Sequence, residues 1–167
     1  MHRRTVLAAH AFVAALVGAT AAGAQLAVQP DKENVVASRL DGPWEPDAEL
    51  TLRLGGRAVG KLSFTNNAVV ATKIPAKYET FFKGRQVYMA GTMSGRGKEY
   101  PFVLIEHKGN PHIVFFRERD GDPLGDAESF NVMLAVGKDK QDDLLFVGGD
   151  FNNQPFSAYR RVKADAK

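Results

Sequence analysis

The sequence predicts a mainly β fold, an antiparallel meander of seven or eight strands that forms a barrel or a strongly curved sheet. Short runs rich in β-branched and aromatic residues recur along the chain, with turn residues between them. The connections are too short for the crossovers that parallel strands need. Several runs are apolar on both faces, so a second layer is expected to cover the outside of the sheet.

Residues 1–24 have the parts of a cleavable signal peptide. The chain begins Met-His-Arg-Arg, which is a positive start. The apolar stretch that follows is shorter than the ~20 residues that span a bilayer, and Ala22-Gly23-Ala24 is a small-x-small cleavage site. We therefore expect a periplasmic or extracellular protein with no membrane insertion after cleavage. The arginine pair also fits a twin-arginine signal, so the export route stays open, and a buried N-terminal helix is the alternative.

Composition narrows the class of protein. The formal net charge is +3, and removal of Arg3 and Arg4 with the leader leaves 20 basic against 19 acidic residues, or +1. A nearly neutral chain without a Lys/Arg stripe predicts no nucleic-acid partner. The absence of cysteine excludes thiol nucleophiles and thiolate metal sites. We expect one β-rich domain over residues 25–163 and a frayed tail at 164–167, and the oligomeric state is left open.

The expected strands cover residues 60–65, 86–93, 100–107, 112–118, 130–136, 143–149 and 156–162. Alternation places Val87, Met89 and Met93 on one face of the second run. It likewise places Phe130, Val132, Leu134 and Val136 on one face of the fifth. Residues 25–38 read as an irregular lead-in. Residues 49–54 are ambiguous, and their alternating leucines favour a strand over a helix.

One or two short helices are expected at about residues 67–83. Asn67 can cap the first, Pro75 separates it from the second, and Gly84 ends the second. The second helix carries aromatic residues at positions i, i+3 and i+4, namely Tyr78, Phe81 and Phe82. We expect this aromatic helix to pack on the sheet or across the mouth of the barrel.

Gly42-Pro43-Trp44, just before the first expected strand, resembles the Gly-x-Trp opening of lipocalins and their calycin relatives. The resemblance covers these three residues and the strand meander. It implies that the tryptophan closes one end of a barrel and that a basic residue near the last strand, Arg160 or Arg161, packs over its ring. The helical insertion departs from the lipocalin pattern and is closer to the helical lid of intracellular fatty-acid-binding barrels, which lack an export signal.

The favoured function is a non-enzymatic binding module for an apolar or amphipathic small molecule, held in a cavity under the aromatic helix. The surplus of Phe and Met on both strand faces, with a helix available as a lid, indicates this function. The candidate ligand-binding residues are Trp44, Tyr78, Phe81, Phe82 and Arg117.

Residues 117–128 form the most distinctive polar stretch, with candidate cation ligands at Asp120, Asp122, Asp126 and Glu128. Carboxylate oxygens are the ligands that calcium prefers, so the second hypothesis is a Ca²⁺-dependent surface module. The first hypothesis, the binding module, requires no cofactor. The EF-hand spacing is not met. The alternative is a solvated hairpin connection whose acidic charge is balanced by Arg117 and Arg119.

A third hypothesis is a small hydrolase that uses His107 or His112 with a carboxylate such as Glu106. The two histidines flank a short turn, so they are expected to lie on the same side of one hairpin, where they could also hold a metal. The chain has no Gly-x-Ser-x-Gly elbow and no glycine-rich phosphate loop. The amide-rich residues 148–155 read either as a wide turn or as a carbohydrate-contact surface.

Overall fold

The computed structural model describes residues 34–57, 60–148 and 155–162, so the expected signal peptide and C-terminal tail lie outside the described residues. In this part of the chain, eight antiparallel strands close into a barrel in sequence order, and β8 returns to pair with β1. The predicted barrel meander is confirmed. The strands are β1 (Gly42–Pro46), β2 (Leu62–Asn66), β3 (Val87–Gly95), β4 (Lys98–His107), β5 (Asn110–Arg119), β6 (Asp122–Ala135), β7 (Leu144–Gly148) and β8 (Phe156–Arg161).

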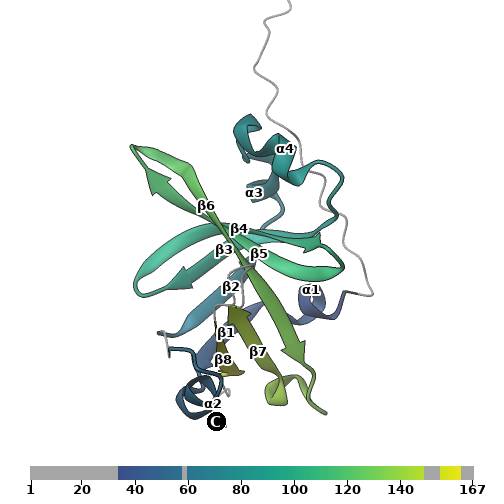
Figure 1. Cartoon of the computed structure of the whole chain (residues 1–167), viewed down its shortest axis with the longest axis vertical. Helices are drawn as coiled ribbons and strands as arrows, with labels where there is room; N and C mark the ends of the chain where they lie inside the picture. The colour runs from purple at the N-terminus through teal and green to yellow at the C-terminus, as the bar shows by residue number, and fades with distance from the viewer. Residues whose placement is uncertain (1–33, 58–59, 149–154, 163–167) are drawn as a thin grey trace, which may run out of the picture.

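Short helices lie at the ends and on the outside of this barrel (Figure 1). They are α1 (Val35–Arg39), α2 (Ala48–Arg53), α3 (Val69–Thr72), the 3-10 helix η1 (Ala76–Tyr78), α4 (Glu79–Phe82) and the 3-10 helix η2 (Lys140–Asp142). Figure 1 places α3 and α4 together at the top and α2 at the bottom beside β8. No described helix has the length and apolar character needed to cross a membrane.

Three consecutive hairpins turn on a residue followed by glycine, with positive φ at both positions. These are Arg96-Gly97, Lys108-Gly109 and Asp120-Gly121, with φ of 52°/73°, 53°/76° and 55°/80°. Two positive-φ residues form the type I′ turn, whose twist matches that of the flanking strands. Most of the acidic stretch expected as a loop therefore belongs to β6, which begins at Asp122.

The barrel has an apolar interior and a covered outer face, as the two-faced apolar runs predicted. On β4, Phe102 and Leu104 belong to the interior core, whereas Val103 and Ile105 belong to a second core beneath α3 and α4. The expected face of β3 was wrong at one position. A register shift between Val87 and Met89 turns Val87 outward, while Met89 stays inside the barrel.

Residues 49–54 form a helix, α2, rather than the expected strand. The Asp47 carboxylate caps it by accepting from the Leu50 backbone N–H at 3.1 Å. Thr51 is buried and fastens the helix to β8, because its hydroxyl donates to the Ala158 carbonyl and accepts from the Ala158 N–H. The leucine alternation misled because Leu52 is 76% exposed and has no core role.

The expected lead-in also ends in a helix. Asn34 caps α1 by accepting from the Ala37 N–H at 2.9 Å. α1 leads directly into β1, so it lies at the same end of the barrel as the β4–β5 turn and the β6–β7 connection. We call this the closed end. The opposite end, which holds the β3–β4 turn and the adjoining ends of β7 and β8, is the open end.

Candidate functional site

The closed end is filled by Trp44 and Leu40, both fully buried. The Trp44 indole N–H donates to the Leu40 carbonyl at 2.8 Å, which fixes the ring beneath α1. The Arg161 guanidinium lies 4.0 Å from the centre of the Trp44 ring, as the Gly-x-Trp resemblance implied. Arg160, the other candidate for this contact, instead pairs with Asp47 outside the barrel.

Buried charged side chains lie at the same end of the barrel as the Trp44–Leu40 plug. Asp143 is fully buried and its Oδ1 accepts from Arg39 at 2.8 Å and from the Gly137 N–H at 3.0 Å. Burial lowers the pKa of Arg161, while the negative charge of Asp143 acts in the opposite direction. Asp143 Oδ2 and two Arg161 nitrogens lack a hydrogen-bond partner within the described residues. Asp143 and Arg161 also line a hollow of about 240 Å³, together with Asp142, Arg160 and other residues around η2.

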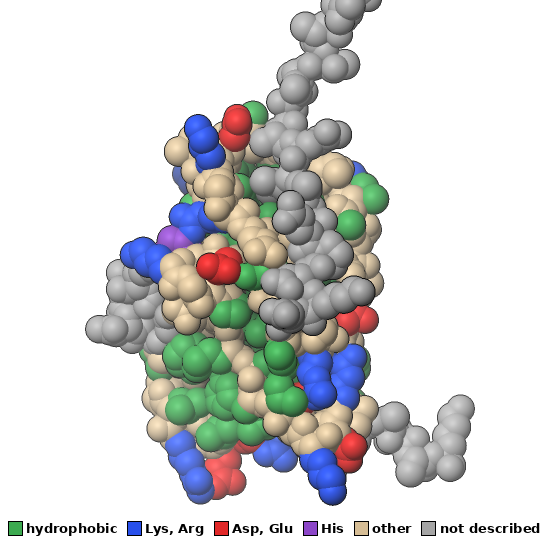
Figure 2. Space-filling model, turned by 90° about the vertical axis from the view of Figure 1, so that its right-hand side faces the viewer, with side chains coloured by type: hydrophobic (Ala, Val, Ile, Leu, Met, Phe, Trp, Pro, Cys, Tyr) green, Lys and Arg blue, Asp and Glu red, His purple; other side chains and the backbone are tan. Residues whose placement is uncertain are grey.

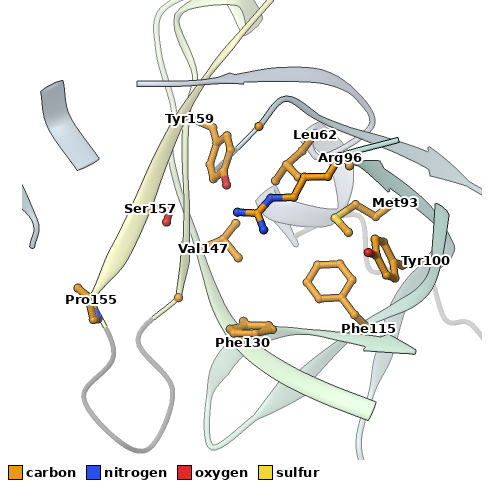
Figure 3. Close-up of a pocket in the computed structure, with 13 residues that line it drawn as sticks. Leu62, Met93, Arg96, Tyr100, Phe115, Phe130, Val147, Pro155, Ser157 and Tyr159 are labelled. Atoms are coloured by element: carbon orange, nitrogen blue, oxygen red, sulfur yellow. The ribbon is translucent and has the colours of Figure 1, made fainter. Parts of the chain in front are cut away.

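The open end holds a cavity of about 270 Å³ (Figure 3). An engineered apolar cavity of ~150 Å³ accepts benzene, so this volume suits a small organic molecule. Apolar side chains from five strands form its walls, namely Leu62, Met93, Phe115, Phe130 and Val147. Polar atoms enter it from Arg96, Tyr100, Ser157 and Tyr159.

The polar groups of the cavity differ in their burial and in their hydrogen-bond partners. Burial raises the pKa of Tyr159 to about 12, against the opposing positive charge of Arg96 and a hydrogen bond with Ser157. The Ser157 hydroxyl donates to the Arg57 carbonyl at 2.9 Å. Arg96 is an exposed residue, and Figure 3 shows its guanidinium directed into the cavity. The site thus combines apolar walls with one cation and two phenols.

No family model, curated protein or solved structure matches the chain. The side chains of the barrel are therefore the basis for assigning its function.

The candidate ligand-binding residues do not line the cavity. Tyr78 and Phe82 pack on Phe116 outside the barrel, with ring centroids 5.4 Å and 6.3 Å from it, and Phe81 is 37% exposed. Trp44 belongs to the plug of the closed end. The aromatic helix covers the outer face of β3, β4 and β5, so the cavity lies inside the barrel and not under that helix.

Arg117 and the four candidate cation ligands lie on the β5–β6 hairpin, where the carboxylates pair with basic side chains. Arg117 bridges Asp126 and Glu128. Lys77 pairs with Asp122 at 2.8 Å, and the hydrogen bond from Lys77 lowers the pKa of that carboxyl group. The remaining pair joins Asp120 to Arg119 at 3.7 Å. Within the described residues, no three His, Asp or Glu side chains are grouped to hold a metal, and cation binding stays a prediction.

His107 and His112 lie together as expected, with ring centroids 5.0 Å apart. Their contact is diagonal, because His112 pairs with Ile105 and His107 with Asn110. Glu106 accepts a hydrogen bond from the Tyr88 hydroxyl at 2.6 Å. The pair lies toward the closed end, away from the cavity, and a hydrolytic role for it stays a prediction. Residues 149–154 of the amide-rich segment lie outside the described residues.

The outside of the barrel also carries exposed apolar side chains. Met133 on β6 is 49% exposed and Val136, just beyond that strand, is 50% exposed. Figure 2 shows the side of the molecule that lies to the right in Figure 1, and apolar side chains gather over its lower half. Apolar atoms contribute much of the surface of any folded protein, so this face receives no functional assignment.

Arg96 is the functional residue that sequence reasoning missed. Its sequence signal is the Arg96-Gly97 pair between two β-rich runs, which predicts a two-residue hairpin turn. Which end of the barrel that turn reaches, and which way its first side chain points, depend on the closure of all eight strands.

Proposed function

We propose that this protein is an exported binding module that takes up an apolar or amphipathic small molecule in the open-end cavity. One observation carries the proposal. A barrel whose closed end is filled by Trp44 and Leu40 keeps an apolar-walled space of about 270 Å³ at its other end. Apolar surface removed from water contributes roughly 25 cal/mol per Å², so a ligand that replaces water there gains free energy.

The barrel is lipocalin-like in this proposal. Gly42-Pro43-Trp44 forms the start of β1, and Arg161 packs on the Trp44 ring from β8. The insertion that contains α3, η1 and α4 distinguishes the chain from that pattern, since it covers the outer face of the barrel and contributes no described residue to the lining of the open-end cavity. Export, which the features of residues 1–24 favour, would place such a binder in the periplasm or outside the cell.

A binding role is preferred to a catalytic one because of the chemistry of the lining. The cavity walls described here include neither histidine nor carboxylate, and the Ser157 hydroxyl donates to a backbone carbonyl. A serine nucleophile needs a general base within hydrogen-bond reach. Binding is therefore the function that these side chains support best.

Titration of the processed protein with N-phenyl-1-naphthylamine tests the proposal. This neutral apolar dye becomes fluorescent in apolar surroundings, and Trp44, the only tryptophan of the chain, can excite it by energy transfer. We expect saturable binding of one dye per protein. Absence of saturable binding by the folded protein would contradict the proposed function.

A matched pair of variants locates the dye. Val147→Phe places extra volume in the cavity, whereas Val136→Phe makes the same change at a half-exposed position outside it. We expect Val147→Phe to weaken dye binding at least about tenfold, because overfilling a limited space costs ~1–3 kcal/mol. Val136→Phe is expected to bind like the unmodified protein, and equal effects of the two variants would place the dye elsewhere.

A further inference from the structure

We infer that the ligand of the open-end cavity carries a carboxylate, which pairs with Arg96 at the mouth. This inference rests on the proposed function and specifies the class of ligand. It follows from the charge of the cavity, the geometry of the β3–β4 turn and the state of the Arg96 guanidinium.

The described lining of the cavity carries a positive charge. Arg96 is the one charged residue among the described lining residues, and the other polar side chains there are Tyr100, Ser157 and Tyr159. A single positive charge beside apolar walls attracts an anion and repels a cation. A neutral ligand would fill the same space but would leave the guanidinium without a counter-charge.

Arg96 occupies an unusual position for an arginine in the β3–β4 turn. Arg96 has φ of 52° and is followed by Gly97 with φ of 73°. Asn, Asp and Gly are the residues favoured at such positions, so the turn itself does not explain an arginine. From this turn the side chain reaches over the mouth, and Figure 3 shows the guanidinium between Tyr159 and Val147 on one side and Tyr100 on the other.

The Arg96 guanidinium differs from other arginines of the barrel in its pairing. Arg39, Arg117 and Arg160 each pair with a carboxylate. Within the described part of the chain, Arg96 takes part in no hydrogen bond or ion pair. Its field nevertheless acts inside the cavity, since its charge lowers the pKa of Tyr159 against the larger effect of burial.

These features define the form of the ligand. A guanidinium presents a planar fork of N–H donors that matches the two oxygens of a carboxylate. The phenol groups of Tyr100 and Tyr159 lie in the same cavity, and a phenol hydroxyl can donate a hydrogen bond to an anion. The apolar body would then lie against Leu62, Met93 and Phe115, which gives an amphipathic monocarboxylate such as a medium-chain fatty acid.

Competition between two molecules of equal chain length tests the inference. Bound N-phenyl-1-naphthylamine is displaced with decanoate or with decan-1-ol at neutral pH and low salt. We expect decanoate to compete at least about tenfold better than decan-1-ol. Hydrogen bonds to charged groups contribute about 1.5–3 kcal/mol, and ~1.4 kcal/mol corresponds to a factor of ten.

Variants of one hairpin assign the preference to Arg96. Arg96→Gln is expected to abolish the preference for decanoate and to leave dye and decan-1-ol affinities within about twofold. Arg96→Lys, which keeps the charge without the planar fork, is expected to retain part of it. Lys98→Gln removes a positive charge from the same hairpin outside the cavity and is the control, expected to keep the full preference.

The outcomes separate the two proposals. Saturable dye binding without a decanoate preference, or a preference that survives in Arg96→Gln, overturns the carboxylate inference and leaves the proposed function standing. Failure of the dye itself to bind overturns the proposed function, and the inference falls with it. Circular dichroism of each variant establishes that the barrel is intact in every comparison.

Discussion

The two ends of the barrel each hold an inward-facing arginine, but in opposite circumstances. Arg161 at the closed end is 6% exposed, lies on the Trp44 ring and donates to the Asp41 carbonyl. Arg96 at the open end is exposed and has no hydrogen bond or ion pair within the described residues. The contrast indicates that Arg161 contributes to the stability of the fold, whereas Arg96 contributes to ligand binding.

The packing of side chains also differs between the closed end and the open end. The closed end combines a fully buried tryptophan with a buried carboxylate, Asp143, that forms an ion pair with Arg39. Breaking such a buried pair, or emptying a filled core position, costs several kcal/mol in typical proteins. At the open end, Phe130 and Val147 are only half-buried and border the cavity. We therefore expect stability to be concentrated at the closed end.

The largest expected effect comes from truncating an aromatic side chain at each end. Trp44→Ala should lower the free energy of unfolding by about 3–5 kcal/mol, because it empties a fully buried site. Phe130→Ala, at a half-buried site beside an existing space, should cost about 1–2 kcal/mol. Urea unfolding followed by far-UV circular dichroism measures both. A cost for Phe130→Ala equal to that for Trp44→Ala would break the comparison between the two ends.

An intermediate effect is expected at high pH from Tyr159. Burial raises the pKa of its phenol to about 12 in the folded state, whereas the ordinary pKa of a tyrosine is 10.0. Unfolding in this window releases a proton, so the stability fully present below pH 10 is lost as pH rises through about 12. The loss should be about 3 kcal/mol, since the pKa rises from 10.0 to about 12 and each unit of pKa corresponds to about 1.36 kcal/mol.

Tyr159→Phe is the control for this effect, because it keeps the ring and removes the titrating group. Its free energy of unfolding should fall less steeply over the same pH range. Arg96→Gln should move the Tyr159 transition, followed by phenolate absorbance, to still higher pH, because it removes a charge that lowers this pKa. An unchanged transition would show that the guanidinium does not face the cavity.

The sequence could predict the fold class because alternation and turn residues are local signals. The runs around Phe102 and Phe130, and the X-Gly pairs between strands, directly indicate strands and hairpins. Local signals failed where another contact decided the outcome. α2 is a helix because Asp47 caps it and Thr51 bonds to β8, and Ala158 lies 107 residues from Thr51 in the sequence.

The candidate site was harder to predict than the fold. Aromatic residues at helical spacing correctly indicated a buried face for Tyr78 and Phe82, but the pattern cannot tell a lid from a cover on the outside of a barrel. The cavity draws Leu62, Phe115 and Tyr159 from three different strands. These residues converge only through the closure of β8 on β1, which no local window of sequence encodes.

The smallest expected effect concerns Arg117, a third arginine and the paired counterpart of Arg96 on the neighbouring hairpin. Arg117 already neutralises Asp126 and Glu128 from a position that a cation would occupy, while Lys77 holds Asp122. All of these side chains are 41–47% exposed, so each pair contributes ~0–1 kcal/mol to stability.

Excess Ca²⁺ should therefore shift the melting temperature by less than about 1 °C relative to chelator. A ligand bound only by the native state raises stability in proportion to its affinity, and here it would have to displace basic side chains. Arg117→Ala leaves Asp126 and Glu128 without their shared cation, so its melting temperature should fall slightly and recover partly with Ca²⁺. A large increase in the melting temperature of the unmodified protein with Ca²⁺ would instead support the cation-dependent module. It would also show that carboxylates paired with an arginine can still bind a cation.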